Sequence, residues 1–308
     1  MKYLNLIRYK NLFLLAFMQL IFRYGFLKQQ NIWLSLSDFQ YILLVLATVL
    51  IAAGGYVIND IFDVETDSIN KPKKLIIGSK ISEGIAYNIY AGLTISGVAI
   101  GMYLSNIIQK PQFITLFIFV AALLYFYATT LKQLLLIGNI IVALLLSFSI
   151  IIIGFFDLYP ATYEGNQELM SLIFSILKDY AIFAFIINFI REITKDCEDY
   201  NGDISQNMRT LPIAIGIHKT SKIIFILLLI SVLILLNYIN NNLMQYELYY
   251  SIIYALITII APLIYCAIRA WSSKDKNDFQ TISKILKFII FFGILSIAVI
   301  TYNIIHNV

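Results

Sequence analysis

Long apolar runs follow one another along this chain, and they restrict its possible folds more than any other feature. Each run holds roughly 20 residues, which is the length of a helix that crosses the hydrocarbon core of a bilayer. Hydrophobic residues make up 60% of the 308 residues and charged residues only 13%, whereas about 25% of a soluble domain is charged. Lipid cannot satisfy open backbone groups, so each run predicts a helix. We therefore expect an all-α integral membrane protein.

Short polar segments separate nine such runs. The runs cover 10–27, 39–60, 83–105, 112–131, 134–157, 171–192, 219–239, 249–271 and 283–305. The first run follows Lys2, Arg8 and Lys10, as the apolar region of a signal peptide would. No small-residue cleavage site follows it and Arg23 interrupts it, so we retain it as a transmembrane helix. We predict nine transmembrane helices in a single domain, 1–308.

The basic residues are distributed unequally between the two sides that this helix count defines. With a cytoplasmic N-terminus, 18 of the 22 Lys and Arg residues fall in cytoplasmic segments. The others are Arg23, Lys28, Lys110 and Lys178. Such an excess inside is the usual orientation signal of multi-pass proteins. We expect a plasma-membrane protein with no nucleic-acid partner.

Two polar stretches repeat one spacing of aspartates. The first copy consists of Asp60, Asp63 and Asp67. The second copy, 136 residues later, consists of Asp196, Asp199 and Asp203. Positions i, i+3 and i+7 share one stripe of a helix, and Asn59 would lie at the edge of the first stripe. Solvated, acidic helix ends are the simplest alternative, but they do not account for the duplication. The paired stripes predict a divalent-cation site.

The constant offset also predicts two similar, parallel four-helix units followed by a ninth helix. Transporters contain parallel repeats too, so the repeat alone does not identify an enzyme. The ionisable groups of a transporter should lie near the bilayer midplane on broken helices. Here both acidic stretches follow a predicted helix, the second and the sixth, on the cytoplasmic side. We therefore favour an enzyme and keep a transporter as the alternative.

Cations accompany both acidic stretches. They are Lys71, Lys73 and Lys74 after the first, and Arg191, Lys195 and Arg209 around the second. Magnesium is usually held by one or two carboxylates while substrate phosphates fill its other positions. Carboxylates for a metal, with Lys and Arg for phosphate oxygens, therefore predict a diphosphate site. The positive-inside bias is the alternative explanation for these cations, and we adopt it for Lys274, Lys276, Lys284 and Lys287.

Both motifs resemble those of one enzyme family. N-D-I-F-D-V-E-T-D at 59–67, followed by N-K-P-K-K and Gly78, resembles the first aspartate-rich motif of the UbiA superfamily of intramembrane prenyltransferases. R-E-I-T-K-D-C-E-D-Y-N-G-D at 191–203, followed by R-T-L-P at 209–212, resembles the second. Weaker similarities involve Arg8, Asn11, Tyr127, Lys132 and Asn139. The resemblance covers nearly the whole chain.

The resemblance implies a reaction. Two Mg²⁺ ions held by the acidic motifs would bind the diphosphate of a polyprenyl donor and stabilise it as it leaves. An aromatic ring or a hydroxyl of a lipophilic acceptor would attack the cationic allylic carbon. The prenyl tail would lie in an apolar tunnel open to membrane lipid.

The resemblance also implies roles for individual residues. The metal ligands would be Asp60, Asp63, Asp67, Asp196, Asp199 and Asp203, with Asp60 and Asp196 in support. The catalytic residues would be Asp63, Asp199, Lys195 and Arg191. The substrate-binding residues would be Asn59, Lys73, Lys74, Lys132, Arg209, Arg8, Asn11 and Tyr127. Lys73 or Lys74 stands where many members have arginine, which makes bidentate phosphate binding less available.

The exact motif form indicates a branch of the superfamily. R-E-x-x-K-D-x-E-D-x-x-G-D, with N-K-P after the first motif, is similar to the geranylgeranylglyceryl-phosphate geranylgeranyltransferases of ether-lipid synthesis. It also resembles homogentisate and chlorophyll-type prenyltransferases. The R-x-x-R-P of the 4-hydroxybenzoate branch is missing. We predict geranylgeranyl transfer to geranylgeranylglyceryl phosphate, with an aromatic quinone precursor as the alternative acceptor.

Several polar residues lie inside apolar runs. They are Gln19, Arg23, Asn139 and Asn188. Burial in a membrane is costly for such groups, so we expect interior positions with partners. For Arg23, snorkelling to the membrane surface is the alternative. The small residues at 52–55 predict close packing of the second helix.

Overall fold

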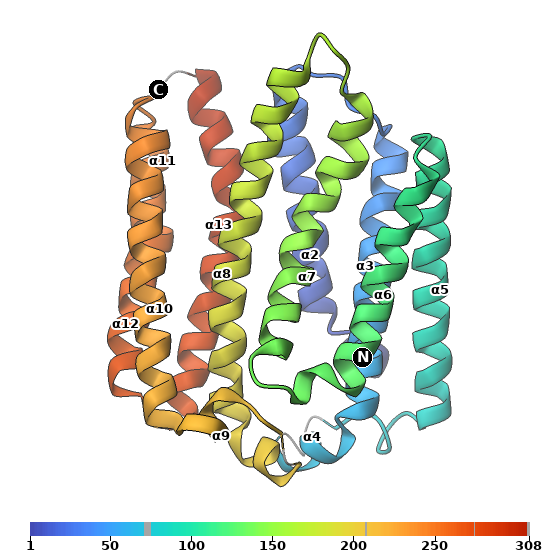
Figure 1. Ribbon diagram of the computed structural model, residues 1–308, viewed down its shortest axis with the longest axis vertical. Helices are drawn as coiled ribbons and strands as arrows, with labels where there is room; N and C mark the ends of the chain where they lie inside the picture. The colour runs from blue at the N-terminus through green and yellow to red at the C-terminus, as the bar shows by residue number, and fades with distance from the viewer. Residues whose placement is uncertain (71–74, 207, 274, 307–308) are drawn as a thin grey trace.

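A computed structural model, which describes residues 1–70, 75–206, 208–273 and 275–306, contains helices in each of the nine predicted runs (Figure 1). The first seven α-helices are α1 (Lys2–Leu6), α2 (Tyr9–Leu20), α3 (Asp38–Phe62), α4 (Val64–Asn70), α5 (Glu83–Ile107), α6 (Ile114–Thr129) and α7 (Ile137–Ile153). The others are α8 (Gln167–Ser205), α9 (Leu211–Ile215), α10 (Ile217–Tyr238), α11 (Tyr249–Ala255), α12 (Ala261–Ser272) and α13 (Lys276–His306). The described residues form no named strand, so the all-α prediction is confirmed.

Short π-helical or 3₁₀ segments continue or connect the α-helices. They are η1 (Ile21–Phe26), η2 (Leu27–Gln30), η4 (Pro111–Phe113), η5 (Leu131–Gln133), η6 (Gly154–Leu158), η7 (Tyr159–Ala161), η8 (Ile239–Met244) and η9 (Leu256–Ile260). Because η9 joins α11 to α12 without a gap, the predicted run 249–271 is one helical segment.

Eight helical segments in the described part of the chain are long and apolar enough to cross a membrane. The segment formed by α2 and η1 is not among them, although it is helical as predicted. This segment carries Lys10, Gln19 and Arg23 within its length. A multi-pass membrane protein is therefore confirmed, while the count of nine spans stays a prediction.

The core consists of two large apolar clusters that share α8. One cluster joins α2, η1, α3 and α7 to the first half of α8, through residues such as Phe22, Leu44 and Leu177. The other joins the second half of α8 to α10, α11, α12 and α13, through residues such as Ile190 and Leu263. In Figure 1, α8 accordingly stands between α10–α13 on one side and α2, α3 and α7 on the other. Helix α8 therefore contributes to both halves of the core.

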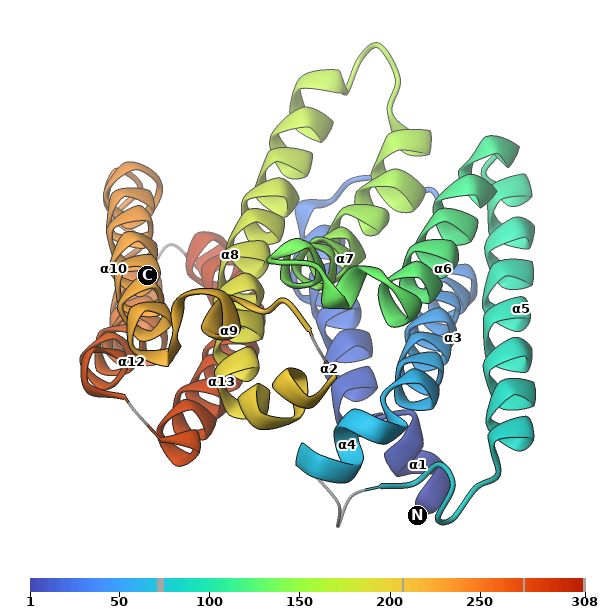
Figure 2. The same ribbon diagram turned by 60° about the horizontal axis from the view of Figure 1, so that its bottom comes forward.

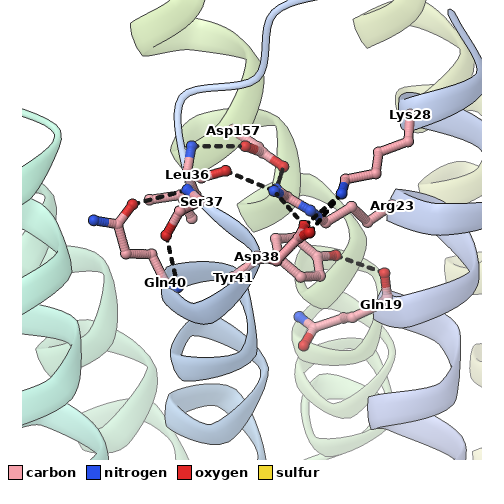
Figure 3. A network of polar contacts seen from close by, with 9 residues as sticks. All are labelled: Gln19, Arg23, Lys28, Leu36, Ser37, Asp38, Gln40, Tyr41 and Asp157. Atoms are coloured by element: carbon pink, nitrogen blue, oxygen red, sulfur yellow. Dashed lines mark hydrogen bonds and ion pairs between the residues drawn. The ribbon is translucent and has the colours of Figure 1, made fainter.

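Close packing of α3 depends on its small residues, as predicted. A Cβ added to Gly54 would lie 2.5 Å from Oγ1 of Thr94 on α5. A Cβ added to Gly55 would lie 2.9 Å from Leu124 on α6. The absence of side chains at these positions therefore lets α3 approach both helices. At the start of α3, Ser37 and Gln40 form a reciprocal capping box (Figure 3).

The polar residues inside the apolar runs are buried and bonded, as expected. Asn139 donates to Asp196, and Asn188 donates to the backbone oxygen of Ala184. Arg23 is only 1% exposed and is paired with Asp157, so the snorkelling alternative is wrong for this residue. Because the buried Asp157 carboxylate neutralises it, the Arg23 guanidinium does not need to reach the membrane surface. The sequence pattern did not associate Asp157 with Arg23.

Candidate active site

The two acidic motifs lie at the same end of the bundle, where α3 continues into α4 and α8 ends. We call this the motif end; α4 and α9 mark it at the bottom of Figure 1 and in front in Figure 2. The short helix α4 packs against α8, so the two motifs are neighbours in space. Each motif occupies the last turns of its helix or the turn after it. Because α3 and α8 end at the same face of the bundle, the two motifs lie there together.

The first motif does not lie on one continuous helix, contrary to the stripe predicted from its spacing. Helix α3 ends at Phe62, Asp63 is its C-cap with φ −96° and ψ 4°, and α4 begins at the next residue. Two helical hydrogen bonds still span the break, from the N–H of Asp63 to the oxygen of Asn59 and from the N–H of Asp67 to the oxygen of Asp63. The second motif, by contrast, lies entirely on α8.

Two cations from distant parts of the chain pair with the first motif. Arg8 lies 2.7 Å from Asp60, and Lys132 lies 2.6 Å from Asp63. Asn59 also donates its side-chain N–H to Asp63. Burial is the largest single influence and acts to lower the pKa of Arg8, but the combined attraction of Asp60, Tyr56 and Asp63 outweighs it and raises this pKa. Predicted substrate residues and predicted metal ligands are thus in direct contact.

The second motif is partly enclosed. Asn139 on α7 donates to Asp196 at 2.9 Å, and Asp203 is only 6% exposed. Asp196 is repelled by Asp203 and Glu192 and attracted by Lys195, which places all four side chains in one electrostatic neighbourhood. Carboxylates that repel each other favour a bound cation, because a cation reduces their mutual repulsion.

A compact charged group lies at the start of the second motif on α8, one turn before its aspartates. Lys195 is 2.5 Å from the Glu192 carboxylate, and Arg191 is 3.5 Å from the same oxygen. The Nε atom of Arg191 is buried and has no hydrogen-bond partner among the described residues. Glu192 therefore holds two cations in position while at least one donor remains available for a ligand. The aspartate spacing predicted no role for Glu192, although this residue stands inside the quoted second motif.

A cavity of about 180 Å³, which we call the site cavity, extends from these charges into the apolar interior. Its polar wall includes Arg8, Asn11, Tyr56, Asn59, Tyr127, Arg191, Glu192 and Lys195. Its apolar wall includes Leu15, Ile51, Phe117, Leu124, Leu146, Phe148 and Ile152, from α2, α3, α6 and α7. A cavity with charges at one end and hydrocarbon at the other fits an amphiphilic ligand with an anionic head.

Four of the eight predicted substrate residues line this cavity, namely Arg8, Asn11, Asn59 and Tyr127. Asn11 accepts a hydrogen bond from Lys287 at 2.6 Å, and Tyr127 lies near Glu192 and Asp63. The backbone N–H of Arg209 donates to Gln133, next to Lys132, although the Arg209 side chain is exposed. Lys73 and Lys74 lie outside the described residues.

Tyr56 is a further residue that the sequence analysis missed. The guanidinium of Arg8 stacks over its ring at 5.0 Å, and Tyr56 lines the site cavity. A tyrosine inside an apolar helix gave no signal of its own, because many tyrosines in this chain are at membrane interfaces or in the core.

The residues of the motif end fit Mg²⁺. All candidate ligands are carboxylate or amide oxygens, which Mg²⁺ prefers. The side-chain oxygen of Asn59 is buried and has no hydrogen-bond partner among the described residues. No group of three or more His, Cys, Asp or Glu side chains in the described ranges is close enough to hold a metal by itself. At such a site Mg²⁺ would take one or two protein carboxylates and complete its shell with substrate phosphate.

Comparison with known proteins identifies the same family as the motif resemblance. The model of the UbiA prenyltransferase family matches residues 24–299. A digeranylgeranylglyceryl phosphate synthase of Saccharolobus solfataricus is 38% identical over 209 residues, which are 67% of this chain and 68% of that protein. A protein of the same name from Methanobrevibacter smithii is 34% identical and covers 87% of this chain and 89% of its own.

Solved structures share the fold. A structure from work on digeranylgeranylglyceryl phosphate synthase in membranes has a TM-score of 0.64, 25% identity, and covers 97% of both chains. A UbiA homologue from Archaeoglobus fulgidus, bound to DMAPP and Mg²⁺, has a TM-score of 0.59 at 16% identity, over 96% of this chain and 99% of its own. The matched family model spans most of the chain, including both acidic motifs. The chain therefore belongs to the UbiA prenyltransferase family.

Proposed function

We propose that this prenyltransferase transfers a geranylgeranyl group from geranylgeranyl diphosphate to geranylgeranylglyceryl phosphate. The observation that carries the proposal is a cavity with an apolar far wall that both motifs reach, the first through Asn59 and the second through Arg191 and Lys195. The cations Arg8 and Lys132 pair with the aspartates of the first motif beside it. The acceptor follows from the branch-specific motif form and from relatives that carry the name digeranylgeranylglyceryl phosphate synthase. Membership of a prenyltransferase family favours this enzyme over the transporter alternative.

The donor fits the site cavity head first. Its diphosphate would lie at the motif end, against Arg8, Lys132 and Lys195, and its tail would lie along the apolar wall formed by residues such as Phe117 and Phe148. Bound Mg²⁺, held by the two acidic motifs, would neutralise diphosphate charge and make it a better leaving group. Two cations now pair with Asp60 and Asp63, and they would turn toward phosphate oxygens when a metal takes those carboxylates.

The reaction exchanges one C–O bond for another. The bond between the allylic carbon and the diphosphate breaks, and the diphosphate leaves with the electron pair. The glycerol hydroxyl of the acceptor forms an ether bond to that carbon and gives its proton to the released diphosphate. The protein contributes position, charge and exclusion of water, because the allylic end lies between the charged wall and the apolar wall. The rings of Tyr56, Tyr127 and Phe148 line this region, where they would face a developing cation.

The acceptor brings a third phosphate group, and the motif end has cations beyond those near the first motif. The cations near the second motif are Arg191, Lys195 and Arg209. An aromatic acid would need a single cation and a stacking surface instead. We also propose that the motif end faces the cytoplasm at the plasma membrane, because it collects most of the basic residues of the chain.

The test is an acceptor comparison with purified protein, geranylgeranyl diphosphate and Mg²⁺. Geranylgeranylglyceryl phosphate, 4-hydroxybenzoate and homogentisate are offered singly and as a mixture, and mass spectrometry identifies the products. We expect digeranylgeranylglyceryl phosphate with the first acceptor and no prenylated aromatic acid. Prenylation of either aromatic acid, with the glyceryl phosphate unchanged, would assign the protein to the quinone branch.

A further inference from the structure

A second cavity, of about 120 Å³, lies farther from the motif end along α8: Ala184 and Ile187 line it, whereas Arg191 and Lys195 line the site cavity. Side chains of α8, α10, η8, α11, η9 and α13 line it, with single contributions from η1 and α7. Its wall is almost entirely hydrocarbon, and includes Phe183, Ile187, Leu235, Ile259, Ile290 and Ile294. Nothing in the transfer of the donor tail uses this space, because the donor has an apolar wall of its own in the site cavity.

Three of the four polar side chains that line the second cavity have hydrogen-bond partners, and the ring of the fourth, Tyr238, packs edge-on against Phe183. Tyr180 and Ser296 bond to each other at 2.8 Å, and the hydroxyl of Ser251 bonds to Asn303 at 3.0 Å. A buried water needs two to four polar partners, which these satisfied groups do not supply. The chemistry of this space therefore suits a hydrocarbon chain rather than water or a polar ligand.

One end of the second cavity points toward the motif end and meets cations there. Figure 1 shows α8 and α13 running in opposite directions. On α8, Arg191 follows the lining residue Ile187 by one turn, about 6 Å along the axis. On α13, Lys287 precedes the lining residue Ile290 by about 4.5 Å. Both helices thus place a cation at the same end of the apolar lining.

These two cations form one electropositive group. Lys287 lies within electrostatic range of Arg191 and Lys10, and it donates to Asn11 at 2.6 Å. Arg191 lines the site cavity and has a buried Nε without a partner among the described residues, and Lys287 contacts Asn11, another lining residue of that cavity. The positive-inside bias explains neither the contact of Lys287 with Asn11 nor the orphaned donor of Arg191. A phosphate bound here would accept a hydrogen bond from the Nε–H of Arg191 and would be attracted by the Lys287 ammonium.

We propose that the second cavity binds the isoprenoid chain of the acceptor, with the acceptor phosphate at Arg191 and Lys287. This inference rests on the proposed function, in which both substrates carry a long isoprenoid chain and an anionic head. Each chain then has its own cavity, and the two cavities adjoin successive turns of α8. The two heads meet beside Arg191, and the acceptor hydroxyl is presented to the allylic carbon from the side of α13.

Gly293 allows the cavity to be filled without disturbing its surroundings. A Cβ at this position has no heavy atom within 4 Å, and the residue lies in the interior of α13 and lines the second cavity. Replacement of a helical glycine by leucine also raises helix propensity, so Gly293→Leu should fold. Gly92→Leu is the matched control, because Gly92 is an exposed residue of α5 with equally open space at its Cβ.

The experiment measures KM for each substrate separately, with the other substrate saturating. For Gly293→Leu we expect the KM for geranylgeranylglyceryl phosphate to rise roughly tenfold or more while the KM for the donor changes less than about twofold. A shorter acceptor, geranylglyceryl phosphate, should be affected much less. Gly92→Leu should match the wild type. A rise in the donor KM instead, or no change in either KM, would overturn the proposal.

The phosphate end is tested with Lys287→Gln, Lys287→Arg and the control Lys284→Gln. Lys284 is an exposed residue three positions away on the same helix. Lys287→Gln should raise the KM for the acceptor. Lys287→Arg should keep this KM close to the wild-type value, and Lys284→Gln should not change it. Equal effects of the two glutamine variants would contradict a phosphate site at Lys287. Absence of any product with this acceptor in the wild type would instead refute the proposed function.

Discussion

The ion pair between Arg23 and Asp157 gives the sharpest stability prediction, because it is buried at the end of the bundle opposite to the active site. Asp157 is 0% exposed and accepts from Arg23 and from the backbone N–H of Leu36 at 3.1 Å (Figure 3). Arg23 also donates to the oxygen of Leu36 at 2.6 Å, and its guanidinium lies 4.4 Å from the ring centre of Tyr41. The pair thereby ties η1 to η6 and to the start of α3.

Asp157→Asn should lower the free energy of unfolding by about 3–5 kcal/mol, since it leaves a buried guanidinium without its counter-charge. Asp38→Asn is the control. Asp38 also contacts Arg23, but its side chain is 57% exposed and it bonds mainly to Lys28 at 2.6 Å. Solvent screens such a pair, so Asp38→Asn should lower the free energy of unfolding much less than Asp157→Asn does. The double variant Arg23→Met/Asp157→Leu should be less destabilised than Asp157→Asn, because no unpaired charge is left.

Equilibrium unfolding of the purified variants in mixed micelles, followed by circular dichroism, measures these differences. Turnover per folded molecule should stay near the wild-type value for Asp157→Asn, because the network lies far from both acidic motifs. The reasoning would be refuted if Asp157→Asn and Asp38→Asn were destabilised equally, or if the double variant were the least stable of the set.

Three further predictions concern the site, the packing of α3 and the topology. Lys132→Met should lower kcat/KM for the donor by roughly 10- to 100-fold, the equivalent of one charge-assisted hydrogen bond, and Lys132→Arg should retain more activity; equal rates for both would argue against a phosphate role. Gly54→Leu should cost about 1–3 kcal/mol of stability by overpacking against α5, unlike Gly92→Leu, as unfolding curves would show; identical curves would mean that α3 and α5 separate freely. Cysteines at Lys80 and Arg209 should react with an impermeant thiol reagent from the same, cytoplasmic side of sealed vesicles, and labelling from opposite sides would exclude a shared site.

Sequence periodicity was sufficient to predict the long helices and the proximity of the two acidic motifs. The apolar runs predicted each long helix, and the duplicated aspartate spacing predicted that two distant segments belong to one site, which the contact between α4 and α8 supports. Such predictions succeed because lipid imposes helices locally and because short-range spacing determines which residues share a helix face.

The partners of the charged groups were not predictable in the same way. Arg8 and Asp60 are 52 positions apart, Lys132 and Asp63 are 69 apart, and Lys287 contacts Asn11 across 276 positions. These pairings depend on how the helices are arranged around each other, which no local pattern specifies. The end of α3 at Phe62 is a similar case, since the two motifs have the same aspartate spacing but only α8 stays continuous.

The central claim is that the two acidic motifs act together, through Mg²⁺, on one donor diphosphate. The most direct test is the rate of diphosphate release from geranylgeranyl diphosphate, with saturating acceptor, as Mg²⁺ is titrated for the wild type, Asp63→Asn and Asp199→Asn. We predict that wild-type release requires Mg²⁺ and that each variant, although folded, loses most of its rate, because a metal-held charge contributes several kcal/mol in the transition state. Near-normal release by either variant at limiting Mg²⁺ would contradict the claim.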